Sequence, residues 1–79
     1  MSPTVFRAHG MRFFFFTREE SRPHIHVMHA GREAKFWLEP AIEIADNHGL
    51  SPRHLARARQ LIGEHQDEIR RAWQEQFGS

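Results

Sequence analysis

The hydrophobic and polar positions divide the chain into a strand-rich first part and a helical last part. Short runs of aromatic and β-branched residues, separated by segments that contain Gly or Pro, are typical of strands and turns. A fifth short strand is expected where Ile42 and Ile44 flank Glu43, with a single helical turn as the alternative. The four strands expected before it cover residues 4–8, 11–17, 24–29 and 34–38.

Four consecutive phenylalanines, Phe13–Phe16, lie in the second of these strands. An uninterrupted apolar run of this kind predicts a strand that is covered on both faces. We expect one face to pack against a helix and the other against a partner or the chain's own loops. A stacking surface for RNA bases is the alternative interpretation.

The last third of the chain predicts one long amphipathic helix over about residues 52–77. Ser51 is typical of an N-cap and Pro52 of a first helical position. Gly78 is typical of a residue that ends a helix. Apolar residues recur every three or four positions, so one face of the helix is expected to cover the sheet. Gly63 is a poor helix former and favours a bend.

The predicted class is therefore α+β, a small, mainly antiparallel sheet of four or five strands packed against one long C-terminal helix. A chain of 79 residues forms a single domain, here residues 1–79. A domain of this size buries only about 60% of its unfolded surface. A homodimer or a complex with another protein would add to that burial.

The composition of the chain limits the kinds of metal site, cellular location and binding partner that we expect. The chain has no cysteine and therefore neither a disulfide nor a thiolate metal site. No apolar run is long enough to span a bilayer, and the N-terminus lacks the apolar core of a signal peptide. We expect a soluble, cytoplasmic protein that does not enter a membrane. A net charge of +1 argues against a general polyanion binder, although the preference for Arg over Lys suits phosphate and carboxylate recognition.

The most informative motif is a Pro-His-Ile-His-Val segment that starts at Pro23. Alternate side chains of a strand point to the same face, so His24 and His26 should lie side by side. We expect both imidazoles on an exposed face, next to Arg22 and near Lys35.

This arrangement suggests acid–base chemistry on RNA. Cleavage of a phosphodiester needs a base for the 2′-hydroxyl, an acid for the leaving oxygen and cations for the developing charge. His24 and His26 are the candidate acid–base pair. Arg12, Arg22 and Lys35 are the candidate phosphate contacts. On this interpretation the reaction needs neither a metal nor another cofactor.

Two alternatives compete with catalysis. Zinc takes three or four ligands, and His24 and His26 supply only two. A third ligand would have to come from another residue, and the candidates are His9, His29, Glu19 and Glu20. In the structural alternative, a histidine donates a hydrogen bond to a loop carbonyl and completes the packing. His65, on the apolar stripe of the helix, is expected to be such a core residue.

A second basic feature lies at the start of the predicted helix. Arg53 and Arg57 are one helical turn apart with no acidic residue between them. They are candidates for contact with phosphates or with acidic residues of a partner.

Three segments, Arg12–Phe16, Pro23–Val27 and Ala34–Leu38, followed by a helix that ends near Trp73, resemble a small bacterial family. That family is catalogued as domain of unknown function 4160, and the resemblance covers nearly the whole chain. Its members are typically encoded beside another small family, domain of unknown function 2442, in pairs that look like toxin–antitoxin operons. The resemblance therefore implies a small cognate antitoxin-like protein as partner, with this chain as the toxin-like member.

The family pattern maps onto His24, His26 and Lys35, with two departures. The first Pro of the usual motif is Arg22 here, and the Tyr often found near the end of the aromatic strand is Phe16. If that Tyr hydroxyl takes part in a reaction, this chain lacks it. The leading hypothesis is a toxin-like protein that acts on RNA or translation. A non-catalytic protein–protein interaction module and a metal-binding domain are the alternatives.

Overall fold

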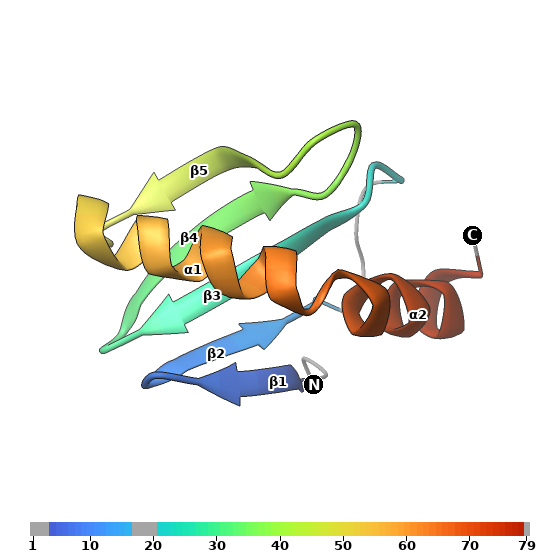
Figure 1. The fold of residues 1–79 in the computed structure, drawn as a ribbon, viewed down its shortest axis with the longest axis horizontal. Coiled ribbons are helices and arrows are strands. Elements are labelled where there is room, and N and C mark those ends of the chain that lie inside the picture. The colour runs from blue at the N-terminus through green and yellow to red at the C-terminus, as the bar shows by residue number, and fades with distance from the viewer. Residues whose placement is uncertain (1–3, 17–20, 79) are drawn as a thin grey trace.

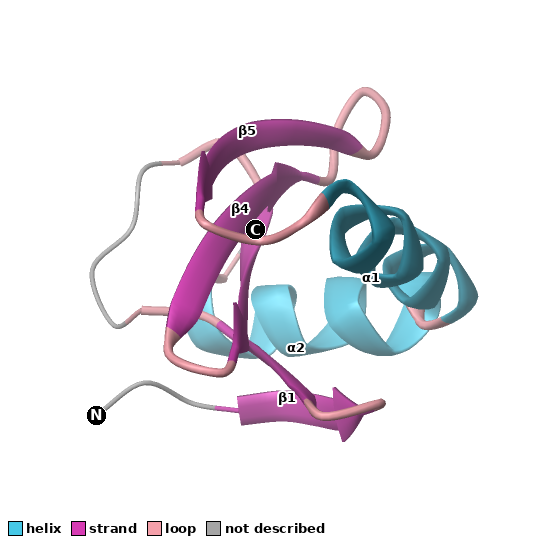
Figure 2. Ribbon diagram, turned by 90° about the vertical axis from the view of Figure 1, so that its left-hand side faces the viewer, coloured by secondary structure: helices cyan, strands magenta, loops and turns pink. Residues whose placement is uncertain are grey.

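The computed structural model describes residues 4–16 and 21–78. Within these residues, five strands precede two helices (Figure 1). The elements are β1 (Thr4–Ala8), β2 (Met11–Phe14), β3 (His24–His29), β4 (Arg32–Trp37), β5 (Glu43–His48), α1 (Pro52–Glu64) and α2 (Gln66–Phe77). The strands pair antiparallel in chain order, and both helices lie on the same side of the sheet (Figure 2). The predicted α+β class is confirmed.

Two-residue turns set the register of two strand pairs, β1–β2 and β3–β4. His9 and Gly10 join β1 to β2 with φ values of 51° and 74°, and Ala30 and Gly31 join β3 to β4 with 50° and 76°. Positive φ at both positions is the type I′ geometry, whose twist matches that of the flanking strands. The tight turn after β3 places β4 directly opposite β3, residue for residue along six pairs.

The core lies between the sheet and the helices. Ile25 and Val27 on β3 are completely buried, as are Ala58 and Ile62 on α1. Phe13, Phe14 and Phe15 are also buried, whereas Phe16 is 39% exposed. Packing therefore accounts for the first three phenylalanines, and only the last is exposed enough to stack on a base.

The C-terminal third forms two helices rather than one long helix. The backbone leaves helical geometry at His65, where φ is −109° and ψ is 20°. The His65 ring stacks on Phe6 of β1 with 4.0 Å between ring centroids, and its Nδ1 lies 2.9 Å from the carbonyl oxygen of Leu61. These contacts hold His65 between the two helices, which agrees with its expected role in the core.

Strand boundaries differ from the prediction at several ends. β2 ends at Phe14, and Thr17, which the predicted strand included, lies outside the described residues. β4 begins at Arg32, two residues early. The fifth strand exists and the alternative helical turn is wrong. β5 pairs with β4 across an irregularity at Lys35 and Phe36, a detail of register that periodicity does not encode.

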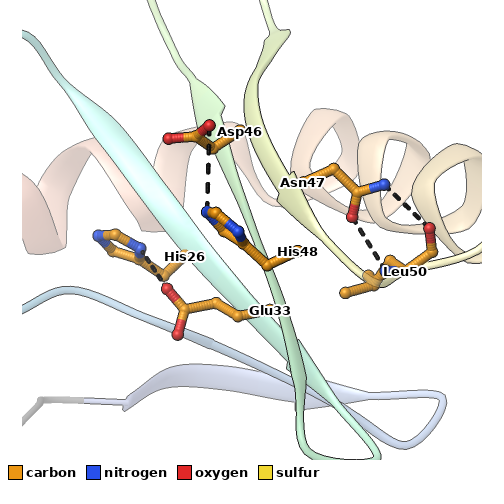
Figure 3. A network of polar contacts seen from close by, with 6 residues as sticks. All are labelled: His26, Glu33, Asp46, Asn47, His48 and Leu50. Carbon is orange, nitrogen blue, oxygen red and sulfur yellow. Dashed lines mark hydrogen bonds and ion pairs between the residues drawn. The ribbon is translucent and has the colours of Figure 1, made fainter.

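A side-chain turn connects β5 to α1. The Asn47 amide nitrogen donates to the Leu50 carbonyl at 3.0 Å, and the Leu50 N–H donates to the Asn47 side-chain oxygen at 2.9 Å (Figure 3). The Ser51 hydroxyl oxygen then accepts from the His54 N–H at 3.2 Å, as its predicted N-cap role requires. Neither helix of the described residues is long and apolar enough to cross a membrane.

Candidate functional site on the outer face of the sheet

The candidate site lies on the face of the sheet opposite the helices, called the outer face below. Cross-strand pairing places His26 between Phe14 of β2 and Lys35 of β4, and it places His24 opposite Trp37. The strand residues of the outer face that matter here are Arg12, Phe14, His24, His26, Glu33, Lys35 and Trp37. Four of the five site residues predicted from the sequence are in this set.

His24 and His26 lie side by side, as strand alternation predicts. Their ring centroids are 5.2 Å apart with the rings nearly perpendicular. The expected exposure of the two rings is wrong, because His24 is 0% exposed and His26 only 6%. Aromatic rings from other elements pack around them, including Trp73 of α2 against His24 and Phe16 against His26.

His24 is held by the backbone that precedes it. Its Nδ1 lies 2.7 Å from the carbonyl oxygen of Arg22, so the ring donates its Nδ1 proton to that oxygen. The lone pair of the neutral ring is then on Nε2. Trp37 and Trp73 contact the ring edge-on. His24 therefore matches the structural alternative, a buried histidine that satisfies a loop carbonyl and completes the packing.

His26 has a carboxylate as its partner. Its Nδ1 lies 3.3 Å from a carboxylate oxygen of Glu33, which comes from β4 (Figure 3). The side chains are 8% and 31% exposed, so the pair is reached from the surface mainly through Glu33. A carboxylate on Nδ1 fixes the orientation of an imidazole and leaves Nε2 as the proton-accepting atom.

The sequence motifs do not single out Glu33. The signal was present in the turn at Ala30 and Gly31, because a two-residue turn fixes the β3–β4 register. That register sets Glu33 opposite Met28 and, on the same face, diagonal to His26. Residues in diagonal positions are close enough for long side chains to meet.

The three predicted cations also converge on the outer face, each above an aromatic ring. The Arg12 guanidinium lies 4.4 Å from the centroid of Phe14. The Arg22 guanidinium and the Lys35 ammonium lie 4.1 Å and 4.6 Å from the centroid of the Trp37 ring system. Such cation–π contacts contribute roughly 0.5–1 kcal/mol each at exposed sites.

Hydrogen bonds also fix the positions of Arg12 and Arg22. Arg12 Nε donates to the Thr4 hydroxyl at 2.7 Å, and Arg22 Nε donates to the Glu39 carbonyl at 3.1 Å. Arg12 of β2 and Arg22, just before β3, therefore have defined positions on the outer face that carries the His26–Glu33 pair.

The third-ligand candidates do not complete a metal site around the histidine pair. In the part of the chain that the structure describes, no three His, Asp or Glu side chains gather closely enough to hold a metal ion. His29 instead directs its Nδ1 to the Gly10 carbonyl at 3.1 Å. Glu19 and Glu20 lie outside the described residues.

Fold and site together define a small α+β domain with an antiparallel meander, one helix-covered face and one aromatic, cationic face. The family model for a domain of unknown function, DUF4160, matches residues 10–74, and the chain belongs to this family. The match includes the strands of the site and most of both helices. Searches of curated proteins and of solved structures found no match.

Proposed function

We propose that this protein is the toxin-like member of a bacterial toxin–antitoxin pair and that it acts on RNA through the outer face. One observation carries the proposal: the His26–Glu33 pair shares its face with the cations of Arg12, Arg22 and Lys35. Guanidinium and ammonium groups recognise phosphate oxygens and stabilise the charge that builds up on a phosphate under attack.

The proposed proton acceptor is Nε2 of His26. Glu33 holds the opposite ring nitrogen and stabilises the imidazolium that forms. The 2′-hydroxyl oxygen attacks the adjacent phosphorus as His26 takes its proton. The bond from phosphorus to the 5′-oxygen breaks, and water supplies a proton to that oxygen. The products are a 2′,3′-cyclic phosphate and a 5′-hydroxyl end.

The two histidines receive different roles in this proposal. His26 keeps some side-chain exposure and has a carboxylate behind it, whereas His24 is completely buried. We therefore assign proton transfer to His26 alone. His24 is a positioning residue, because its ring packs against that of His26 and is anchored to the Arg22 carbonyl.

Induced expression tests this function. The wild-type chain should slow bacterial growth, and His26→Gln or Glu33→Gln should relieve the effect while the protein stays folded. Glu68→Gln is the matched control, because Glu68 is an exposed glutamate in the first turn of α2, away from the outer face. The purified protein should convert a single-stranded RNA to products with cyclic phosphate ends. Absence of any growth effect and of any RNA cleavage by the wild type would rule the proposal out.

A non-catalytic interaction module is the second candidate, and the burial of His24 favours it. The outer face presents the cations, Phe16 and the exposed side chains of β5 to a partner, whereas the rings of His24 and His26 are buried. The partner would be the small antitoxin-like protein encoded next to this chain, with acidic residues facing Lys35 and Arg22. Co-purification that Lys35→Glu abolishes, combined with no RNA cleavage by the wild type, would establish this candidate over the first.

A further inference from the structure

A second basic site lies on the helix side of the sheet, away from the outer face. A cavity of about 470 Å³ opens between the first turns of α1 and the β1–β2 turn, which lie at the same end of the molecule (Figure 1). We call it the basic cleft. Its lining residues are His9, Met11, Arg53, His54, Ala56, Arg57 and Gln60. None of these seven described residues carries a carboxylate.

Arg53 and Arg57 supply the positive charge of the basic cleft. Both are exposed, and they lie one turn apart on the same side of α1. Among the described residues, no carboxylate forms an ion pair with either guanidinium. Like charges at this spacing destabilise a helix. An anion held between them would remove that cost.

The neighbouring imidazole of His54 adds a hydrogen-bond donor. The Nδ1 atom of His54 lies 2.9 Å from the Ser51 hydroxyl oxygen. In the tautomer whose Nδ1 accepts the Ser51 hydroxyl proton, the ring proton is on Nε2, and an anion in the cleft favours this tautomer. His29 packs against this ring with 4.2 Å between centroids. His54 thus contributes an N–H donor to a cleft that already contains two guanidinium groups.

This set of donors fits a phosphate group better than a carboxylate. One guanidinium fork satisfies both oxygens of a carboxylate. Two guanidinium groups and an imidazole N–H suit an anion with three or more acceptor oxygens. The cavity volume is within the range of small-ligand sites, about 300–1,000 Å³. Met11 and Ala56 add apolar wall for the group that carries the phosphate.

We propose that the basic cleft binds a phosphate group, either of a free nucleotide or of a nucleic acid backbone, through Arg53, Arg57 and His54. The site shares no residue with the outer face. Loss of one function by mutation should therefore leave the other intact.

Binding should be measured on the full chain by NMR titration with inorganic phosphate, a nucleoside monophosphate and a short single-stranded RNA. Resonances of the Arg57 and His54 side chains should shift on binding. Arg53→Gln and Arg57→Gln should each weaken binding about tenfold, the loss expected for one charged hydrogen-bonding group. Arg71→Gln, which removes an exposed arginine of α2, is the matched control and should change binding less than twofold.

The three probes separate the sources of the phosphate. Similar affinity for the monophosphate and the RNA indicates a nucleotide, whereas measurable binding of RNA alone indicates a backbone. Melting curves should show that all three variants remain folded. The proposal is overturned if no probe binds, if Arg57→Gln and Arg71→Gln behave alike, or if a polyglutamate peptide binds more tightly than every phosphate probe.

Discussion

His24 and His26 carry the same side chain two positions apart on β3, and their surroundings give them different chemistry. His24 is enclosed by the rings of Trp37 and Trp73 and directs its Nδ1 to a backbone carbonyl. His26 contacts a carboxylate that is itself partly exposed. At this scale, environment rather than residue type separates a packing residue from a candidate for proton transfer.

Replacing His24 with Ala should therefore lower the free energy of unfolding by about 2–4 kcal/mol. The substitution leaves a cavity between two tryptophans. It also removes the ring N–H that donates a hydrogen bond to the Arg22 carbonyl oxygen. Urea denaturation measures the change. His48→Ala is the control and should stay within about 0.5 kcal/mol of wild type, because His48 is exposed. Equal stability of the two variants would contradict the packing role of His24.

At the scale of elements, Gly31 is required by the backbone geometry of its turn, whereas Gly63 only lowers the helix propensity of α1. Gly63 lies in α1 at ordinary helical geometry, and an added Cβ would meet only a side-chain carbon of Ile42, at 4.0 Å. Gly31 in the β3–β4 turn also has space for a Cβ, but its φ is +76°. The same substitution should therefore have opposite effects at the two positions.

Gly63→Ala should raise the free energy of unfolding by about 0.5–1 kcal/mol, because alanine loses less backbone entropy in a helix. Gly31→Ala should lower it by about 1 kcal/mol, the cost of left-handed geometry for a residue with a Cβ. Thermal unfolding followed by circular dichroism distinguishes the two directions. A lower melting temperature for Gly63→Ala would show that the break between the helices depends on this glycine.

The N-cap of α1 permits a further test at the same scale. Ser51→Ala removes the oxygen that accepts the His54 N–H and should cost about 1 kcal/mol of stability. Ser51→Asp keeps an acceptor at that position and should restore most of the loss, as measured by the midpoint of urea denaturation. If both variants lose stability equally, the cap contributes little here.

At the scale of the whole molecule, the placement of charge matters more than its sum. The formal net charge is only +1. Even so, three cations gather on the outer face and two guanidinium groups at the basic cleft, on opposite sides of the sheet. Attraction to a polyanion should therefore be local and limited to a few phosphates.

Salt dependence tests this arrangement if the outer face binds RNA as proposed. The logarithm of the association constant should fall linearly with the logarithm of the salt concentration. Contacts with about three phosphates of a single strand predict a slope near −2. Lys35→Gln should make the slope shallower by about 0.7, whereas His26→Gln should leave it unchanged. Fluorescence anisotropy at several salt concentrations measures both. Binding that is insensitive to salt would argue against phosphate contacts on this face.

The amino-acid sequence by itself determined the features that depend on local rules. Strand alternation sets His24 and His26 on one face, Gly10 and Gly31 accept the positive φ of tight turns, and Ser51 starts the helix. Each of these depends on backbone geometry within a few residues, which composition and periodicity encode directly.

Only the tertiary structure decided how these features are covered and partnered. Trp73 of α2 helps to bury His24, Glu33 of β4 partners His26, and Phe6 of β1 holds His65 between the helices. The basic cleft likewise combines a helix with a turn from the other end of the chain. Periodicity specifies the face on which a side chain lies, but burial and pairing depend on which distant segments pack over that face.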